Sequence, residues 1–301
     1  MIEINIEKDP LFYIDYEMGL EFLKNIDYNK FNYPENITLF HIYSEIKNEK
    51  ELESVKSFFA TQNLNKSKLI IWSDYDIINH KELQDFVDYI DFRIYNPVEE
   101  SIGTPLEGKI EYLLAKDKKY YLQSDLLRLL VLYKYGGIWI DMDVILLRDF
   151  KPLMDQEFLY QWGGDVDFIK NGCCGTVMSL KKESILAEKF LNEIINQPMI
   201  GECTIWGKDL FARVYENYKF NILPSSFFNT EWLISKTNVK LSDDVLEFWF
   251  ENKCPDNLLF LDSLSWHWHN SSNKDKKIIE NSKFDKLRKI NSDRISKIFK
   301  K

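Results

Sequence analysis

The chain has 301 residues, of which 45% are hydrophobic and 29% charged, and its formal net charge is −9. This length fits one large domain or two small ones with a substantial core. The acidic balance argues against nucleic acid as the main partner, because phosphate contacts need a basic surface. No apolar segment follows Met1 and no run approaches the ~20 apolar residues of a membrane span, so we expect a soluble cytoplasmic protein.

The four cysteines are expected to be free thiols. The adjacent pair, Cys173 and Cys174, lacks CxxC spacing, and no set of cysteines and histidines has the spacing of a zinc site. Buried thiols in a reducing compartment are therefore the simplest interpretation.

The first third of the chain predicts strands that alternate with helices. Strands are expected at 36–44, 68–72 and 92–95, and helices at 50–62 and 81–89. This βαβαβ order indicates an α/β fold, with a Rossmann-like, mostly parallel sheet flanked by helices. In such sheets, ligands bind at the carboxyl ends of the strands.

Residues 124–147 read SDLLRLLVLYKYGGIWIDMDVILL. Ser124 is expected to cap a helix over 125–135, which ends at Gly136-Gly137. A strand is then expected over 138–147. Farther on, the pattern predicts a strand at 174–179, followed by helices at 184–196 and 208–218.

The C-terminal segment differs from the rest in charge. From residue 271 onward there are eleven Lys or Arg residues and four Asp or Glu residues. A helix is expected there with its apolar side chains on one face. These side chains are Phe284, Leu287, Ile290, Ile295, Ile298 and Phe299. Such a basic amphipathic helix either lies on an anionic membrane surface or packs one face on the body. We therefore divide the chain into a domain over 1–270 and a helical tail over 271–301.

Asp141 and Asp143 form the most informative motif of the chain. They lie one residue apart in an apolar strand, so they are expected to share one face of it. Buried carboxylates are costly unless a charge compensates them, so the pair indicates a bound cation. Carboxylate oxygens suit Mg²⁺, Mn²⁺ or Ca²⁺ better than zinc.

Asp125 and Arg128 are neighbours on the preceding helix, because they are three residues apart. They form a structural ion pair, or they serve a ligand: Asp125 accepts hydrogen bonds from sugar hydroxyls, while Arg128 holds it or reaches a ligand oxygen. Beside a metal-binding pair, such residues suit a nucleotide diphosphate sugar, whose leaving group a cation neutralises. His267, or alternatively His269, is a candidate third metal ligand.

Over residues 123–152, the SDLLR segment, the Gly-Gly turn and the IWIDMDV strand resemble the sugar-binding region of DXD-containing glycosyltransferases. That family includes fungal initiating mannosyltransferases, lactosylceramide α-galactosyltransferases, bacterial capsule enzymes and, more distantly, the clostridial glucosylating toxins. Weaker similarities follow in the expected order at 40–43, 171–172 and 206–214, and at His267. The resemblance implies a GT-A fold, to which the tail adds a C-terminal helical extension, together with dependence on Mn²⁺ or Mg²⁺ and retention of anomeric configuration.

Carried over by position, the resemblance assigns roles to individual residues. Asp125 and Arg128 would contact the donor sugar, Asp141 would contact ribose and sugar, and Asp143 would bind the metal directly. His267 would complete the metal site.

Two further assignments follow from the same resemblance. Tyr43 occupies the place where the family offers an aromatic ring to the base, although core packing explains this residue equally well. Asn171 would hold the sugar or the acceptor, although Asn-Gly is also a turn signal. The usual tryptophan of the first strand is absent, and Gly207-Lys208-Asp209 replaces the Gly-Pro often found on the acceptor side. No carboxylate stands out as a covalent nucleophile, which favours a front-face mechanism.

The sequence therefore predicts a hexosyltransferase that moves galactose or glucose from a UDP-sugar to a hydroxyl of a glycan or glycolipid acceptor. Capsule, polysaccharide or lipo-oligosaccharide assembly at the inner face of a membrane is the favoured setting. A toxin-like enzyme that modifies a protein is the alternative. A haloacid-dehalogenase-type phosphatase fits less well, because its Asp-x-Asp motif normally follows the first strand. A non-catalytic nucleotide-sugar-binding module is the remaining rival.

Overall fold

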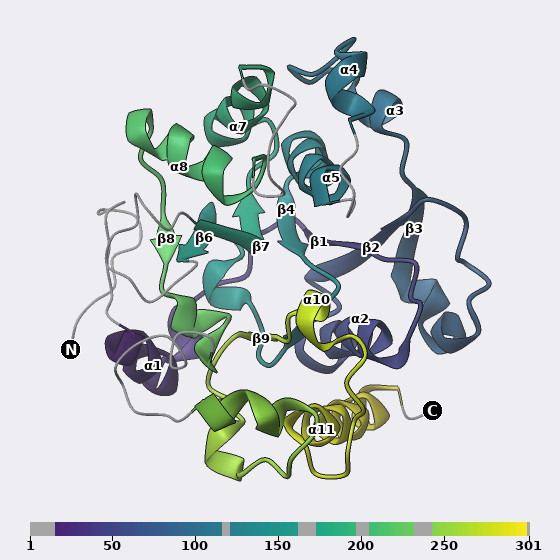
Figure 1. Ribbon diagram of the computed structural model, residues 1–301, viewed down its shortest axis with the longest axis vertical. Coiled ribbons are helices and arrows are strands. Elements are labelled where there is room, and N and C mark those ends of the chain that lie inside the picture. The colour runs from purple at the N-terminus through teal and green to yellow at the C-terminus, as the bar shows by residue number, and fades with distance from the viewer. Residues whose placement is uncertain (1–15, 116–120, 162–172, 197–204, 232–242, 300–301) are drawn as a thin grey trace.

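The computed structural model describes residues 16–115, 121–161, 173–196, 205–231 and 243–299 (Figure 1). A seven-stranded sheet runs through the molecule in the order β3-β2-β1-β4-β7-β6-β8. Its strands are β1 (Thr38–Tyr43), β2 (Ser67–Ser73), β3 (Ile90–Ile94), β4 (Gly137–Ile140), β6 (Phe158–Gln161), β7 (Cys173–Leu180) and β8 (Ile222–Leu223). All neighbouring pairs are parallel except the two that β7 forms with β4 and β6. The predicted mostly parallel α/β sheet is therefore confirmed.

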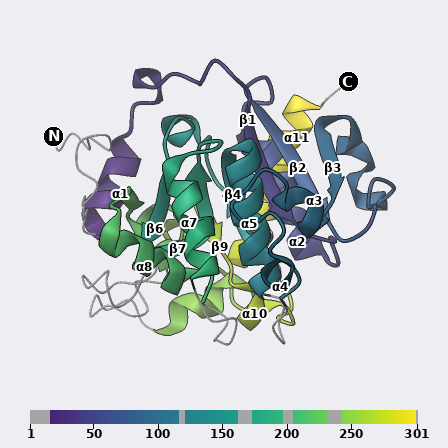
Figure 2. The ribbon, with the colours of Figure 1, turned by 90° about the horizontal axis from the view of Figure 1, so that it is seen from above.

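Helices cover both faces of this sheet. Helices α5 (Tyr121–Tyr135), α7 (Ile185–Ile195) and α8 (Lys208–Asn217) lie on one face, and α2 (Glu49–Thr61) and α11 (Lys283–Ile298) on the other (Figure 1). Seen from above, α5 and α7 lie side by side over the sheet (Figure 2). Strand side chains alternate between the two layers: Ile71 belongs to the core under α2, whereas Ile70 and Trp72 belong to the core under α5.

A second, two-stranded sheet pairs β5 (Val144–Leu146) with β9 (Ser265–His267) in antiparallel orientation. It brings residues 265–267 beside the segment that follows β4. The remaining elements are α1 (Tyr16–Asn25), η1 (Tyr28–Lys30), η2 (Lys81–Tyr89), α3 (Pro97–Ser101), α4 (Ile110–Leu113), η3 (Lys151–Leu153), η4 (Ser225–Phe227), η5 (Asp243–Trp249), η6 (Asp256–Leu258) and α10 (Asn270–Asn273).

The helix predicted at 81–89 is present as a 3₁₀ helix, in which Leu83 and Phe86, three residues apart, form the buried side. Two other local predictions are wrong. Ser124 does not cap α5, because the helix begins three residues earlier, at Tyr121. The strand expected over 138–147 is two strands, β4 and β5, that belong to different sheets.

The Gly136-Gly137 turn lets β4 lie directly against β1. Both residues have positive φ angles, 70° and 112°, in a region that side chains disfavour. A Cβ atom on Gly137 would lie 2.2 Å from the carbonyl oxygen of Leu39. Glycine is therefore required here, and the close approach sets the parallel register of β1 and β4.

His41, on β1, joins this turn to the next strand. Its Nε2 atom lies 3.0 Å from the Gly136 carbonyl oxygen, and the Trp72 indole N–H lies 3.2 Å from its Nδ1 atom. These partners fit the neutral tautomer with the proton on Nε2. Burial lowers the pKa of His41 to about 4.

This buried histidine predicts a loss of stability in mild acid. The unfolded chain binds a proton on His41 near pH 6.5, whereas the folded chain does so only near pH 4. The contribution of neutral His41 to the free energy of unfolding is therefore present above pH 6.5 and lost as the pH falls toward 4. Between pH 7.5 and 5 we expect it to cost about 2 kcal/mol of unfolding free energy. Urea unfolding of wild type and His41→Gln at both pH values checks this, and identical pH dependence in the two proteins would contradict it.

The C-terminal helix α11 packs its apolar face on the body, beside α2 (Figure 1). Phe284 and Leu287 are buried, and the Asn291 amide donates to the Glu53 carboxylate on α2 at 2.7 Å. This contact corresponds to the second of the two alternatives for the tail. The domain division at residue 270 stays a prediction.

Two expectations about composition can be compared with the structure. Cys173, Cys174 and Cys254 are free and buried, whereas Cys203 lies outside the described residues. Within the described ranges, none of the helices is both long and apolar enough to cross a membrane.

Candidate functional site

Asp141, Met142 and Asp143 form the turn that leaves β4 and enters β5. The Val144 N–H donates to the Asp141 carbonyl at 3.1 Å, which closes the turn. The expectation that the two carboxylates share one face of a strand is therefore wrong. Each carboxylate instead has its own set of partners, because the chain changes from the large sheet to the small one between them.

The Asp141 carboxylate lies against Arg128 of α5. The guanidinium Nη2 donates to Oδ1 of Asp141 at 2.9 Å, and the Trp139 indole N–H donates to the same oxygen at 2.5 Å. Nη1 of Arg128 lies 3.3 Å from Oδ1 of Asp125. Arg128 is thus a buried cation between two carboxylates, and the predicted Asp125–Arg128 pair is part of a larger group.

The pKa values in this group follow from burial and pairing. Burial alone would lower the pKa of Arg128, but Asp141 and Asp125 outweigh it and raise the value. Burial raises the pKa of Asp141, and Arg128 opposes that change. The guanidinium therefore stabilises the ionised form of Asp141 in a position where water is scarce.

Gly175, on β7, makes room for this guanidinium. A Cβ atom at Gly175 would lie 2.6 Å from Nη1 of Arg128 and 3.0 Å from the ring of Phe211. The sequence analysis missed this residue. Gly175 could have been found from the sequence as a glycine inside a predicted strand, because such a glycine marks a close approach of another group to the backbone.

The Asp143 carboxylate meets the C-terminal segment. Its Oδ2 atom lies 3.2 Å from Nε2 of His267 and accepts a 2.8 Å hydrogen bond from the Asn270 N–H. The Asp143 carbonyl accepts from the Trp268 N–H at 2.9 Å. Burial would raise the pKa of Asp143, but His267 and the Asn270 N–H outweigh it and lower the value to about 2. Asp143 is therefore an ionised carboxylate at neutral pH.

The two candidate histidines have different surroundings. His267 touches Asp143, because the β5–β9 register sets His267 opposite Val144. His269 stacks on His267, with 3.8 Å between ring centroids, and its Nε2 lies 3.2 Å from the Asn229 side chain. The geometry thus brings His267, rather than His269, next to the predicted metal ligand.

Asn270 is a site residue that the sequence analysis missed. Besides donating its N–H to Asp143, it has a buried side-chain oxygen with no hydrogen-bond partner among the residues that the structure describes. The remaining oxygens of the two aspartates, Oδ2 of Asp141 and Oδ1 of Asp143, accept no hydrogen bond from the described residues. The only indication of Asn270 in the sequence was its position three residues after His267.

These oxygens are hard ligands of the kind that Mg²⁺ and Mn²⁺ prefer, so the residues present fit such a cation. Within the described part of the chain, no three His, Cys, Asp or Glu side chains are already gathered closely enough to hold a metal ion. The fit to a divalent cation therefore rests on the oxygens that accept no hydrogen bond from the described residues, which belong to Asp141, Asp143 and Asn270.

Of the two remaining predicted site residues, Tyr43 and Asn171, the structure describes only Tyr43. Tyr43 ends β1 and donates its hydroxyl to Asp74, which follows β2, at 2.6 Å. Since β1 and β4 are parallel neighbours, Tyr43 and Asp141 lie at the same carboxyl edge of the sheet. Asn171 lies outside the described residues. The functional roles assigned to Tyr43 and Asn171 stay predictions.

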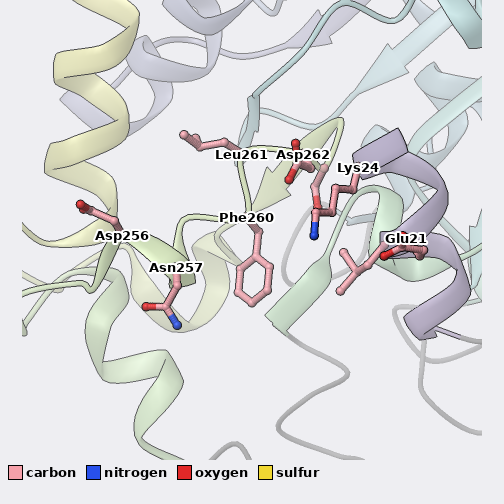
Figure 3. Close-up of a pocket in the computed structure, with 9 residues that line it drawn as sticks. Glu21, Lys24, Asp256, Asn257, Phe260, Leu261 and Asp262 are labelled. Atoms are coloured by element: carbon pink, nitrogen blue, oxygen red, sulfur yellow. The ribbon is translucent and has the colours of Figure 1, made fainter. Parts of the chain in front are cut away.

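A hollow of about 460 Å³ lies elsewhere, between α1 and the loop before β9 (Figure 3). Its walls include Lys24, Phe260 and Asp262. None of the predicted site residues lines it. The hollow is at the end of the β5–β9 ribbon away from Asp143, because the Leu147 N–H pairs with the Leu264 carbonyl there.

Comparison with known proteins connects the DXD turn to a family. Residues 13–160 match the model of the glycosyltransferase sugar-binding region containing a DXD motif. An uncharacterized protein of Arabidopsis thaliana, At4g19900, is 32% identical over 118 residues, which are 35% of this chain. The chain spans only 17% of the length of that relative.

The chain is also similar to solved structures of glycosyltransferases. The apo-form glycosyltransferase GlyE of Streptococcus pneumoniae TIGR4 superposes with a TM-score of 0.50 at 9% identity, over 88% of this chain and 63% of that one. The PaToxG glycosyltransferase gives a TM-score of 0.47 at 18% identity, over 66% of this chain and 74% of that one. The fold is that of the GT-A glycosyltransferases.

Proposed function

We propose that the enzyme moves a hexose from a UDP-sugar to a hydroxyl of a glycan acceptor, because residues 13–160 match the sugar-binding region of DXD-containing glycosyltransferases and the fold is of the GT-A type. One observation carries the proposal. At the carboxyl edge of the sheet, the DXD turn holds one carboxylate paired with Arg128 and another in contact with His267 and Asn270. On this proposal, the carboxylate beside Arg128 would serve the donor sugar, and the carboxylate beside His267 and Asn270 would serve the cation.

Asp143, the side-chain oxygen of Asn270 and His267, together with Asp141, would hold Mn²⁺ or Mg²⁺. When bound, this cation would neutralise the negative charge that grows on the departing diphosphate. The low pKa of Asp143 supports this assignment, because the carboxylate stays ionised without help from a ligand. Asn270 is added here to the ligands that the sequence suggested.

Asp125, Arg128 and Asp141 would hold the donor sugar. Their carboxylate oxygens accept hydrogen bonds from hydroxyls, and Arg128 keeps both carboxylates oriented at 3.3 and 2.9 Å. Such positioning lowers the barrier by fixing the reacting carbon relative to the acceptor. Asn171 would complete the sugar or acceptor contacts, and Tyr43 would pack on the uracil base. We propose retention of configuration by a front-face route, in which a leaving phosphate oxygen takes the acceptor proton.

The acceptor is proposed to be a glycan or glycolipid in capsule, polysaccharide or lipo-oligosaccharide assembly, with transfer to a protein as the alternative. Contact with the inner face of a membrane would then use the exposed lysines of α11, since its apolar face packs on the body. Equal sedimentation of wild type and Lys289→Gln/Lys297→Gln with anionic vesicles would argue against that contact.

A panel of nucleotide sugars tests the proposed reaction. With Mn²⁺, we expect the enzyme to hydrolyse UDP-glucose or UDP-galactose slowly, to leave GDP-mannose intact, and to lose activity in EDTA. Proton NMR of the fresh hexose should show the donor's own anomer first. An inverted sugar would overturn the front-face route. Phosphate release from a simple phosphomonoester, without UDP-sugar turnover, would favour a phosphatase instead.

A further inference from the structure

Helix α2 buries polar side chains along most of its length. Between Lys50 and Ala60, every residue except Lys56 is buried, including Lys50, Ser54 and Ser57. Burying a hydroxyl or an ammonium group is unfavourable unless it finds hydrogen-bond partners. The partners of these three side chains therefore indicate what the helix holds in place.

Ser54 holds the DXD turn. Its hydroxyl donates to the backbone carbonyl of Met142, the middle residue of the motif, at 2.6 Å. Met142 lies between β4 and β5, so its carbonyl has no place in either ladder. Ser54 thus supplies the hydrogen bond that fixes the orientation of the peptide between the two aspartates.

Lys50 holds the segment that carries Asn270. Its ammonium group donates to three backbone carbonyls within 273–276, at 2.6, 3.0 and 2.7 Å, and lies 4.4 Å from the centre of the Phe250 ring. One of these carbonyls is that of the last residue of α10 and the other two follow the helix, whose first residue, Asn270, donates its N–H to Asp143. Lys50 and Ser54 are four residues apart and share one face of α2.

We propose that Ser54 and Lys50 are positioning residues of the donor site, which keep the DXD turn and the α10 turn in register with each other. The inference rests on the proposed function in one respect, since the group that they position is taken to be a cation site at Asp143. One rigid helix spans both turns, so Asp143 and Asn270 keep their separation before any ligand arrives. Such preorganisation is what a metal site requires of the groups behind its ligands.

Ser57 provides a matched control on the same helix. Its hydroxyl is also buried, and it accepts the Leu146 N–H of β5 at 2.9 Å. Ser57 also donates its hydroxyl to the Ser54 carbonyl at 2.7 Å. Ser54→Ala therefore removes one buried hydroxyl with one hydrogen bond to the backbone, and Ser57→Ala removes one buried hydroxyl with two. Only the first removes a bond to the DXD turn, so a general loss of stability would affect both variants alike.

Binding of Mn²⁺ to the full chain, measured by electron paramagnetic resonance, gives the first test. We expect about tenfold weaker binding in Ser54→Ala, and wild-type binding in Ser57→Ala, at similar melting temperatures of the two variants. Lys50→Met should also weaken binding, and Lys50→Arg, which keeps the donors, should restore much of it. Wild-type affinity in Ser54→Ala would overturn the proposal.

Amide hydrogen exchange of the metal-free proteins gives a second test that needs no cation. Ser54→Ala should speed exchange at Val144, and Lys50→Met should speed exchange at Asn270, whereas Ser57→Ala should affect Leu146 instead. Unchanged exchange at Val144 and Asn270 would refute positioning by α2. If wild type binds no Mn²⁺ at all, the cation assignment fails, but the exchange rates still decide whether α2 orders the two turns.

Discussion

Replacing Asp143 with alanine is expected to lower kcat/KM for UDP-hexose turnover by about 10³-fold, because the variant loses the ionised carboxylate on which the proposed cation site depends. His267 and the Asn270 N–H would then lose their shared partner, at 3.2 and 2.8 Å in the native protein. Steady-state hydrolysis of the active UDP-hexose at saturating Mn²⁺ measures the effect. Asp143→Asn keeps the size and one acceptor, so it separates loss of charge from loss of shape.

A control for this variant must remove a part-buried carboxylate outside the site. Asp149 accepts from the Tyr33 hydroxyl and from the Lys151 N–H, on the far side of β5. Asp149→Asn should reduce stability and leave turnover close to wild type. Turnover in Asp143→Ala equal to that of wild type would remove the metal assignment. Absence of turnover in the wild type would instead favour a non-catalytic nucleotide-sugar-binding module.

The first strands of the sheet could be predicted from local pattern because each is an apolar run bounded by polar turns. The same reasoning failed at 138–147, where the run IWIDMDVILL reads as one strand. Nothing local shows that β4 pairs with β1 and β7 while β5 pairs with β9, more than 100 residues farther along the chain. The turn at Asp141–Asp143 is a consequence of that tertiary pairing.

For the candidate site too, contacts within one element could be predicted from the sequence, and contacts between distant elements could not. Asp125 and Arg128 could be paired from their spacing on a helix, and the resemblance pointed to His267. The other contacts of the site are between residues far apart in the sequence. They are the hydrogen bond from Arg128 to Asp141, the close approach of Arg128 to Gly175, and the hydrogen bond from Asn270 to Asp143. Helix α2 illustrates the limit most clearly. Its composition is polar, but its serines and Lys50 are buried, because partners from elsewhere in the chain satisfy them.

Replacing Arg128 with methionine is expected to destabilise the fold by about 3–5 kcal/mol and to abolish sugar transfer. Asp125 and Asp141 would remain buried without the cation between them. Burial already raises the pKa of Asp141 in the wild type, and without Arg128 to oppose it that pKa would rise further, so protonation favours the folded variant more than it favours the folded wild type. The stability gap between wild type and Arg128→Met should therefore narrow as the pH falls from 7 to 5. Urea unfolding at both pH values measures it.

The neutral combination Arg128→Met/Asp125→Asn/Asp141→Asn separates the two roles of the guanidinium. Without charges to compensate, this variant should regain much of the lost stability at pH 7. It should still fail to turn over UDP-hexose, because each asparagine keeps only one acceptor oxygen for the sugar hydroxyls and the guanidinium that orients both side chains is gone. If it transfers sugar at a rate near wild type, the Asp125–Arg128–Asp141 group is a structural ion pair only, and the donor sugar binds elsewhere. If the single variant is as stable as wild type at pH 7, the carboxylates find other partners, and Arg128 does not organise the site.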